Sequence, residues 1–143
     1  VCTGSARLSR RNRLLAALRE PGTEVPRDPQ EAVRRYYALV DAGDVPGVVG
    51  CFAAEAVYHR PGYPPMVGHA ALTDFYASER VIADGRHELD EVVTQGRRVA
   101  VHGRFVGTLK DGSAASVGFA DFWVLDETGR ALTRRTFFDS PAV

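Results

Sequence analysis

The sequence predicts an α+β domain in which helices cover one face of a curved, mostly antiparallel sheet. Two observations carry this prediction. Apolar residues recur at helical spacing in three early stretches, 29–40, 45–54 and 69–78. The second half instead shows strand-like runs separated by turn sequences, which is typical of hairpins. The predicted order is helix, helix, strand, helix and then four strands.

The first helix is predicted to begin after Asp28, because this side chain is a good N-cap and Pro29 can occupy the first helical position. Asp44 is the corresponding cap of the second helix. A short strand over 56–60 follows and stops at Pro61-Gly62, and the third helix comes after Gly68. The inward face of the first helix is formed by Val33, Tyr36, Tyr37 and Val40.

Four strands are predicted near 87–94 and over 98–109, 117–125 and 131–138. The polar segment 126–129, which ends in glycine, supplies the turn of the last hairpin. The strand 117–125 is apolar on both faces, which is typical of a central strand covered on both sides. Its outward residues are Gly118, Ala120, Phe122 and Val124, and we expect a homodimer through the sheet to cover them.

Composition limits the function classes. The 143 residues contain 18 basic and 18 acidic side chains, which gives no electrostatic reason to expect nucleic acid as a partner. No apolar run reaches the ~18 residues of a membrane span, and the expected location is cytoplasmic. The two cysteines, the four histidines and the acids show no metal-ligand spacing, so we expect neither metal nor cofactor. We interpret residues 1–28 as a basic arm that could form a helix, and residues 29–143 as the domain.

Asp121 is the anomaly of the sequence. It lies on the inward line of its strand between Phe119 and Trp123. A carboxylate is almost never buried without a partner or a purpose. Apolar neighbours disfavour its charged form, so a functional Asp121 would donate a proton or serve as a general base. The alternative is a structural ion pair with Arg60 or Arg104.

The stretches YYALVDAGD, FAAEAVYHRPG, GHAALTDFY and FADFWVLDETGRALTRRTFFD follow one another in an order that resembles the NTF2-like superfamily. The resemblance covers about 29–139 and is nearest to the ketosteroid-isomerase and SnoaL-like polyketide-cyclase branch. It implies a cone-shaped fold whose curved sheet and three helices enclose an apolar cavity. It does not imply one reaction, because this fold serves many functions.

The resemblance implies roles for two residues. Tyr36 falls where ketosteroid isomerases keep their oxyanion-hole tyrosine, although its neighbour Tyr37 is an equally good geometric candidate. Asp121 falls where the isomerases keep an aspartic acid that donates to the oxyanion, and where SnoaL-like cyclases keep their acid/base aspartate. Two positions depart from the family. Arg60 replaces the isomerase base, and Thr136 replaces an aspartate of limonene-epoxide-hydrolase-like enzymes.

The remaining candidates depend on which way their strands face. Arg60 and Tyr58 share a face, and Arg60 could bind a substrate oxygen anion there or form a salt bridge at the rim. His59 would then point outward, unless a bulge exchanges the two. His102 and Arg104 are expected on the outer face, and the opposite register would allow a His–Asp dyad with Asp121. The aromatic side chains either line a pocket or fill the core: Phe52, Tyr76, Phe119, Trp123 and Phe138.

Two function classes follow from these residues. The first is a cofactor-free cyclase, isomerase or dehydratase that acts by acid/base chemistry on a small hydrophobic carbonyl or polyketide-type compound, such as those of secondary metabolism. The second is a non-catalytic dimer that binds a small hydrophobic molecule. An epoxide hydrolase of the limonene-epoxide-hydrolase type is a further alternative.

Overall fold

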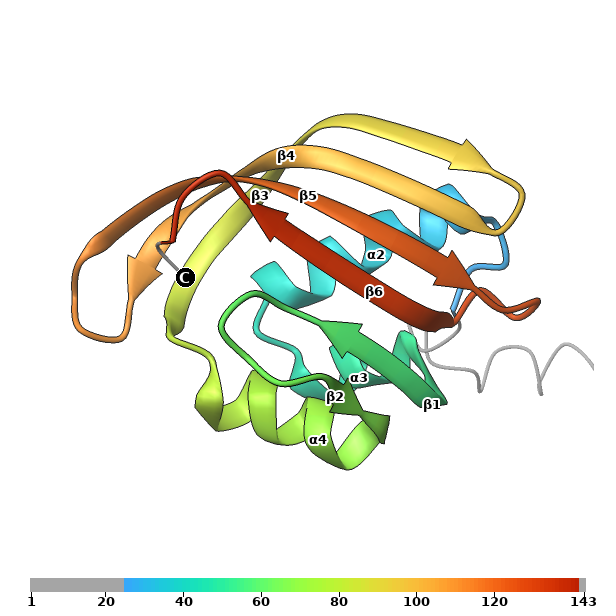
Figure 1. Cartoon of the computed structure of the whole chain (residues 1–143), viewed down its shortest axis with the longest axis horizontal. Coiled ribbons are helices and arrows are strands. Elements are labelled where there is room, and N and C mark those ends of the chain that lie inside the picture. The colour runs from blue at the N-terminus through green and yellow to red at the C-terminus, as the bar shows by residue number, and fades with distance from the viewer. Residues whose placement is uncertain (1–24, 142–143) are drawn as a thin grey trace, which may run out of the picture.

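A computed structural model gives the structure of residues 25–141. A six-stranded sheet curves over a layer of helices, as Figure 1 shows. The helical segments are α2 (Pro29–Asp41), α3 (Val45–Gly50), α4 (Gly68–Asp74) and the π-helix η1 (Phe75–Glu79). The strands are β1 (Phe52–His59), β2 (Met66–Val67), β3 (Ile82–Gln95), β4 (Arg98–Leu109), β5 (Ala114–Leu125) and β6 (Ala131–Phe138).

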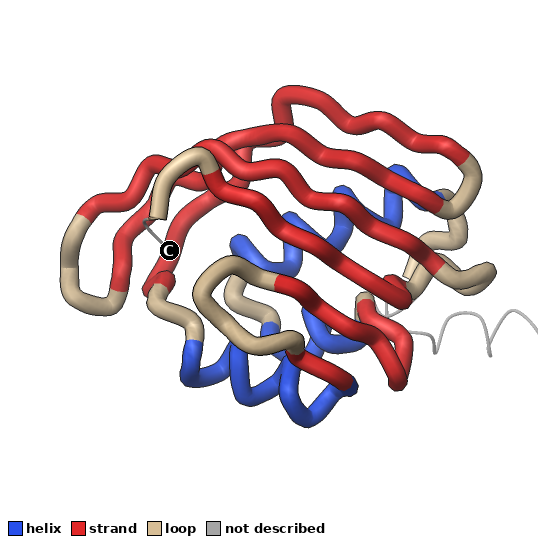
Figure 2. The backbone as a smooth tube through the Cα atoms, viewed as in Figure 1, coloured by secondary structure: helices blue, strands red, loops and turns tan. Residues whose placement is uncertain are grey.

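The strand order is β2-β1-β6-β5-β4-β3. All neighbours pair antiparallel except β1 and β6, which are parallel. The helices gather on the concave side of the sheet, as the tube in Figure 2 shows. The α+β class and the placement of the helices on one face are therefore confirmed.

Both predicted helix caps form. The Asp28 carboxylate accepts a hydrogen bond from the Glu31 amide at 3.0 Å, and Pro29 opens α2. Asp44 accepts from the Gly47 amide at 3.0 Å at the start of α3. The buried face of α2 consists of Ala32, Val33, Tyr36, Tyr37 and Val40. This face is wide enough to bury two adjacent tyrosines, and it places both of them under the sheet.

Three predicted boundaries need correction. The second helix ends at Gly50 rather than at residue 54, because Phe52 already pairs with Ala131 of β6 and begins β1. The segment after the Pro64-Pro65 loop forms the two-residue strand β2, which no periodicity could signal. The third helix changes into the π-helix η1 at Phe75, and Arg80 leaves it in an extended conformation.

The last hairpin forms as predicted. Asp126 Oδ1 accepts hydrogen bonds from the Thr128 and Arg130 amides at 2.9 and 3.0 Å, and Gly129 adopts the φ of 88° that the turn requires. The inward residues of β5 are all buried: Val117, Phe119, Asp121, Trp123 and Leu125. On the outer face, Phe122 is 52% exposed and its ring lies 5.9 Å from that of Phe137. The homodimer that would cover this face stays a prediction.

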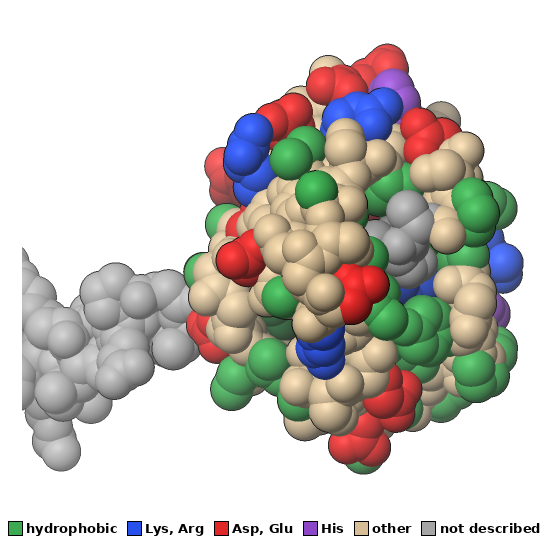
Figure 3. All heavy atoms as spheres, turned by 90° about the vertical axis from the view of Figure 1, so that its left-hand side faces the viewer, with side chains coloured by type: hydrophobic (Ala, Val, Ile, Leu, Met, Phe, Trp, Pro, Cys, Tyr) green, Lys and Arg blue, Asp and Glu red, His purple; other side chains and the backbone are tan. Residues whose placement is uncertain are grey.

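The molecular surface carries charges of both signs. Figure 3 shows acidic, basic and apolar side chains interspersed on one face. None of the helices within 25–141 has the length and apolar character needed to cross a lipid bilayer. Most of the predicted basic arm, residues 1–24, lies outside the described part of the chain.

Candidate functional site

The site is built around Asp121, whose side chain is fully buried. The register of the β5–β6 hairpin decides its surroundings. Asp121 lies opposite Thr136, and Trp123 lies opposite Arg134. Because inward residues alternate along a strand, Arg134 and Thr136 both face the interior beside the carboxylate. One hairpin therefore brings a carboxylate, a guanidinium cation and a hydroxyl group together.

Three lines of hydrogen-bond donors end at the Asp121 carboxylate. Arg134 Nη2 donates directly to Oδ2 at 2.8 Å. The Tyr37 hydroxyl donates to the same oxygen and accepts from Trp123 Nε1 at 3.3 Å. The third line reaches Oδ1 through the Thr136 hydroxyl.

The direction of the third line follows from its last member, because the carboxylate accepts the one hydroxyl hydrogen of Thr136 and Thr136 can then only accept from Tyr58. A guanidinium can only donate, and Arg60 Nη1 lies 3.1 Å from the Tyr58 hydroxyl, which must accept. Tyr58 then donates to Thr136 at 3.0 Å, and Thr136 donates to Asp121. Such aligned chains polarise one another, so the carboxylate is well prepared to carry negative charge.

Arg134 is the ion-pair partner of Asp121, and neither predicted partner is. Arg60 is buried but bonds Tyr58, with its guanidinium over the rings of Phe75 and Phe138 at 5.2 and 5.0 Å. Arg104 lies on the exposed face, 3.6 Å from Asp139. Asp121 thus has an ion-pair partner, as the structural alternative expected, but the partner is Arg134. The charged form of this carboxylate has a cation beside it.

The Arg134 guanidinium also packs against three aromatic rings. Its guanidinium carbon lies 4.5–4.9 Å from the ring centres of Tyr36, Tyr58 and Trp123. Its Nη1 donates to the hydroxyls of Tyr36 and Tyr76, the latter at 3.0 Å. These two hydroxyls lie 2.6 Å apart and share one hydrogen bond. Arg134 thus links the Asp121 carboxylate to a pair of phenols.

The tyrosines keep their protons at neutral pH. Burial, followed by the negative charge of Asp121, raises the pKa of Tyr37 well above its usual value. Burial likewise raises the pKa of Tyr36 well above the usual value. It raises the pKa of Tyr76 to about 12, against the opposing effect of the Arg134 charge. All three phenols are therefore available as hydrogen-bond donors.

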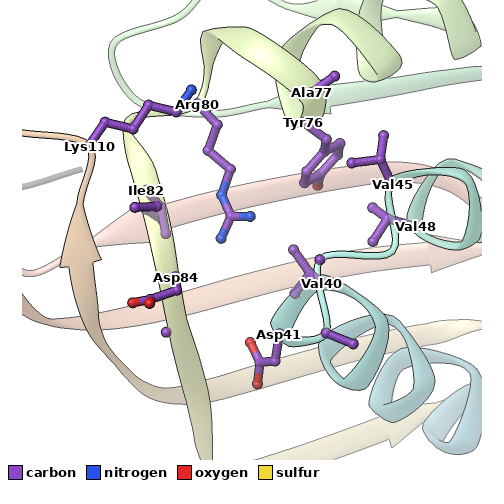
Figure 4. A pocket seen from close by; sticks show the side chains of 14 residues that line it. Val40, Asp41, Val45, Val48, Tyr76, Ala77, Arg80, Ile82, Asp84 and Lys110 are labelled. Carbon is purple, nitrogen blue, oxygen red and sulfur yellow. The ribbon is translucent and has the colours of Figure 1, made fainter.

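A pocket of about 460 Å³ opens beside this network, and Tyr76 belongs to both (Figure 4). Its walls come from α2, α3, η1 and the first part of β3. The main apolar side chains are Val40, Val45, Val48 and Ile82, and the charged ones are Asp41, Arg80, Asp84 and Lys110. Figure 4 shows the Arg80 guanidinium extending into the pocket, whereas the Asp84 carboxylate points away from it. The side chains of the network are buried, whereas the adjacent pocket is accessible from the surface.

Asp41, at the end of α2, is held against β3 by His87. The two carboxylate oxygens of Asp41 accept from the His87 ring Nδ1 at 2.5 Å and from its amide at 2.9 Å. Burial lowers the pKa of His87, and the Asp41 charge opposes this only in part. His87 is thus a neutral donor that orients the Asp41 carboxylate at the edge of the pocket.

The structure places the predicted site residues as follows. Tyr37, not the favoured Tyr36, contacts Asp121, while Tyr36 contacts Tyr76 and Arg134. Tyr58, Arg60 and Thr136 all join the network. Tyr58 and Arg60 face inward and His59 outward, without the exchange that a bulge would cause. His102 and Arg104 are exposed, so they do not meet Asp121.

The predicted aromatic residues surround the network rather than one common pocket. Trp123 and Phe52 pack on Tyr36, and Phe119 packs on Tyr37 and His87. Phe138 covers Arg60. Among residues 25–141 there is no group of three or more His, Cys, Asp or Glu side chains that could hold a metal ion.

Sequence reasoning missed Arg134, the polar role of Tyr76, and the pair of Asp41 and His87. The predicted turn at 126–129 does not by itself set Trp123 opposite Arg134: regular pairing would set Trp123 opposite Leu132, and a register shift between Val124 and Leu125 brings Arg134 there instead. No sequence signal predicts that His87 meets Asp41, since 46 residues separate them.

The chain is similar to known proteins in both sequence and fold. The family model of the SnoaL-like domain matches residues 33–133. An NTF2-like protein of unknown function from Burkholderia pseudomallei is 27% identical, with a TM-score of 0.69 over 78% of this chain and 90% of that one. TerC, co-crystallised with polyporic acid, is 26% identical, with a TM-score of 0.69 over 78% and 91%.

SalBIII, an epoxide hydrolase/cyclase-like enzyme with a role in pyran ring formation in the polyether salinomycin, shares the fold. It is 23% identical, with a TM-score of 0.70 over 79% of this chain and 94% of that one.

Proposed function

Because the chain belongs to the SnoaL-like domain family, we propose that it is an enzyme that transfers protons on a small hydrophobic carbonyl compound. Cyclisation, isomerisation and dehydration are reactions of this class. The observation that carries the proposal is the hydrogen-bonded pair of phenols of Tyr36 and Tyr76, of which Tyr76 lines the pocket. The number of hydroxyl hydrogens in this pair indicates which group it can donate to.

Tyr36 and Tyr76 together own two hydroxyl hydrogens, and Arg134 donates to both oxygens. One hydrogen closes the bond between the two phenols, which leaves one to spare. Tyr76 is 8% exposed and lines the pocket, whereas Tyr36 is 2% exposed and does not, so the proposal places the spare hydrogen on Tyr76. A carbonyl oxygen in the pocket would accept it.

This arrangement suits an oxygen that gains negative charge during the reaction. Donors that are already oriented stabilise such a charge without reorganisation, and removing one typically costs about 10²–10³-fold in rate. Arg134 reinforces the donor, and Asp121 holds Arg134 in place. In this proposal Asp121 acts through Arg134 and Tyr37 rather than by touching the substrate.

Asp41 is the proton acceptor in the proposal. Its carboxylate lies at the pocket and is oriented by His87, as a general base requires. It would take a proton from the carbon next to the carbonyl group, while the oxygen becomes an enolate bonded to Tyr76. Return of the proton from Asp41 at another atom completes an isomerisation. Alternatively, the enolate carbon attacks a second carbonyl group and closes a ring, and the alkoxide that forms takes the proton back from Asp41.

The first experiment measures binding of 2-naphthol, an enolate mimic, across pH by its fluorescence. The wild type should bind the naphtholate form at a pH where free naphthol is neutral. Tyr76→Phe and Asp121→Asn should weaken this preference at least tenfold. Tyr63→Phe is the matched control, because that exposed hydroxyl bonds only the Glu79 carbonyl at 3.4 Å. Equal binding of neutral naphthol and naphtholate by the wild type and all three variants would contradict the proposal.

The second experiment measures exchange of hydrogen for deuterium beside the carbonyl group of cyclic aromatic ketones by NMR. We expect the wild type to accelerate this exchange and Asp41→Asn to abolish the acceleration. Asp84→Asn is the control, since that carboxylate points away from the pocket (Figure 4).

Non-catalytic binding is the second candidate function. It is favoured by the Asp121 carboxylate, which already accepts from three donors and could serve stability alone. This function predicts naphthol affinity without any acceleration of exchange.

A further inference from the structure

The pocket holds a cation without an assigned partner. Arg80 follows the π-helix η1 directly, and its amide closes that helix on the Phe75 carbonyl at 2.9 Å. The backbone then turns into β3, which leaves the side chain to extend across the pocket (Figure 4). Irregular π turns of this kind are frequent at functional sites.

The Arg80 guanidinium makes no hydrogen bond and no ion pair with any residue in the range 25–141. Three other arginines of the domain form ion pairs: Arg134 with Asp121, Arg86 with Glu88 and Arg104 with Asp139. Arg80 is nevertheless half-buried, and burial lowers its pKa despite the opposing effect of nearby tyrosines. A partly desolvated cation without a counterion gains strongly from an anionic ligand.

The neighbouring charges leave room for such a ligand. Lys110 lines the same pocket, but its ammonium group is bound to the Ser78 carbonyl at 2.9 Å. Asp41 is held by His87, and Asp84 points away (Figure 4). Neither carboxylate lies within 4.0 Å of the guanidinium, the limit for an ion pair. Apolar side chains of α2, α3 and β3 form the remaining wall.

We infer that this pocket binds a small apolar molecule that carries a carboxylate, and that Arg80 holds the carboxylate. The planar fork of a guanidinium matches the two oxygens of this group. The inference rests on the proposed function in one respect, namely that the substrate occupies the same pocket. It adds the class of substrate, a carbonyl compound with an acid group, and it moves the predicted anion anchor from Arg60 to Arg80.

The test compares 2-naphthoate with 2-naphthamide, a neutral probe of the same shape, by calorimetry at neutral pH. The wild type should bind the naphthoate at least tenfold more tightly. Arg80→Gln should remove this preference and leave the naphthamide affinity within twofold, whereas Arg80→Lys should keep part of it. Lys110→Met is the matched control, because it removes a cation from the same pocket and should keep the full preference. Circular dichroism verifies that each variant is folded.

Three outcomes would overturn the inference: equal binding of both probes by the wild type, a preference that survives in Arg80→Gln, or no binding of either probe. The proposed function fails separately. A carboxylate preference without accelerated exchange would make the pocket an anion-binding site without chemistry. Accelerated exchange without the preference would keep the enzyme and reject Arg80 as the anchor.

Discussion

Arg134 bonds the Tyr76 hydroxyl and Arg80 lines the same pocket as Tyr76, and the two show different uses of the same side chain. Arg134 is 3% exposed, paired with Asp121 and enclosed by three aromatic rings. Arg80 is half-buried in the pocket and, within 25–141, has no side-chain partner. The two guanidinium groups therefore differ in burial as well as in their partners.

The pairing of charges is the clearer difference between the two centres. Asp121 receives three donors and one positive charge, so its carboxylate is fully paired, although the Nε atoms of Arg134 and Arg60 are buried without a hydrogen-bond partner. At Arg80 the cost of desolvation stays uncompensated until an anion arrives. The inner centre fixes geometry, and the pocket has the capacity to bind. Four variants are given below in order of decreasing expected effect. Two test the inner centre around Asp121, one tests the contact of His87 with Asp41, and one tests the outer face of the sheet.

The largest effect is expected for Arg134→Met. It leaves the Asp121 carboxylate buried without its cation, which typically costs about 3–5 kcal/mol of unfolding free energy. Urea denaturation followed by circular dichroism measures it. Arg135→Met, one residue along the same strand but exposed, should change stability by no more than about 0.5 kcal/mol. Similar values for the two variants would show that the inner centre is not an energetically coupled unit.

Tyr37→Phe should have the next largest effect. It removes one donor of the Asp121 carboxylate and leaves Trp123 Nε1 without its acceptor. A buried group that loses its partner costs about 1–3 kcal/mol. Urea denaturation measures this loss too. Tyr63→Phe should be close to neutral, and a Tyr37→Phe protein as stable as that control would argue that Thr136 and Arg134 suffice.

The pair of Asp41 and His87 predicts a pH dependence of stability. Burial holds the pKa of His87 below the ordinary value of 6.5, so below that pH the unfolded chain binds a proton that the folded chain resists. The unfolding free energy should therefore fall as the pH decreases through about 6.5.

His87→Gln should remove this contribution. Because other groups titrate in both proteins, the informative quantity is the difference in unfolding free energy between wild type and variant, measured from about pH 5 to 7.5. It should increase with pH. His102→Gln, on the exposed face, should show a flat difference. A flat difference for His87→Gln would mean that the Asp41 charge balances the effect of burial.

The smallest effect on the isolated chain is expected for Phe122→Ser. Phe122 is 52% exposed, so its loss should change the unfolding free energy by no more than about 0.5 kcal/mol at low protein concentration. The predicted homodimer through the sheet would add a concentration dependence that the variant loses. Sedimentation of both proteins distinguishes the cases, and a monomeric wild type at high concentration would reject the dimer.

The sequence by itself determined the elements and their inward faces. Capping side chains, helical spacing and the glycine turn before Arg130 are local signals, and each acts within a few residues. They sufficed for the fold class, for the strand β4 at Arg98–Leu109 and for the last hairpin. The inward position of Asp121 also followed from alternation alone. Where strand pairing competed with helical spacing, at Phe52, the local prediction was wrong.

Only the tertiary structure decided which inward groups meet. The choice of Tyr37 over Tyr36 as the partner of Asp121 depends on how α2 lies against the sheet, since both tyrosines face inward. The contacts of Arg134 with Tyr76 and of His87 with Asp41 join residues 58 and 46 positions apart. Their formation depends on sheet curvature and helix docking, which arise from the packing of the whole core. The same packing leaves Arg80 in the pocket without a carboxylate, a property that no spacing in the sequence encodes.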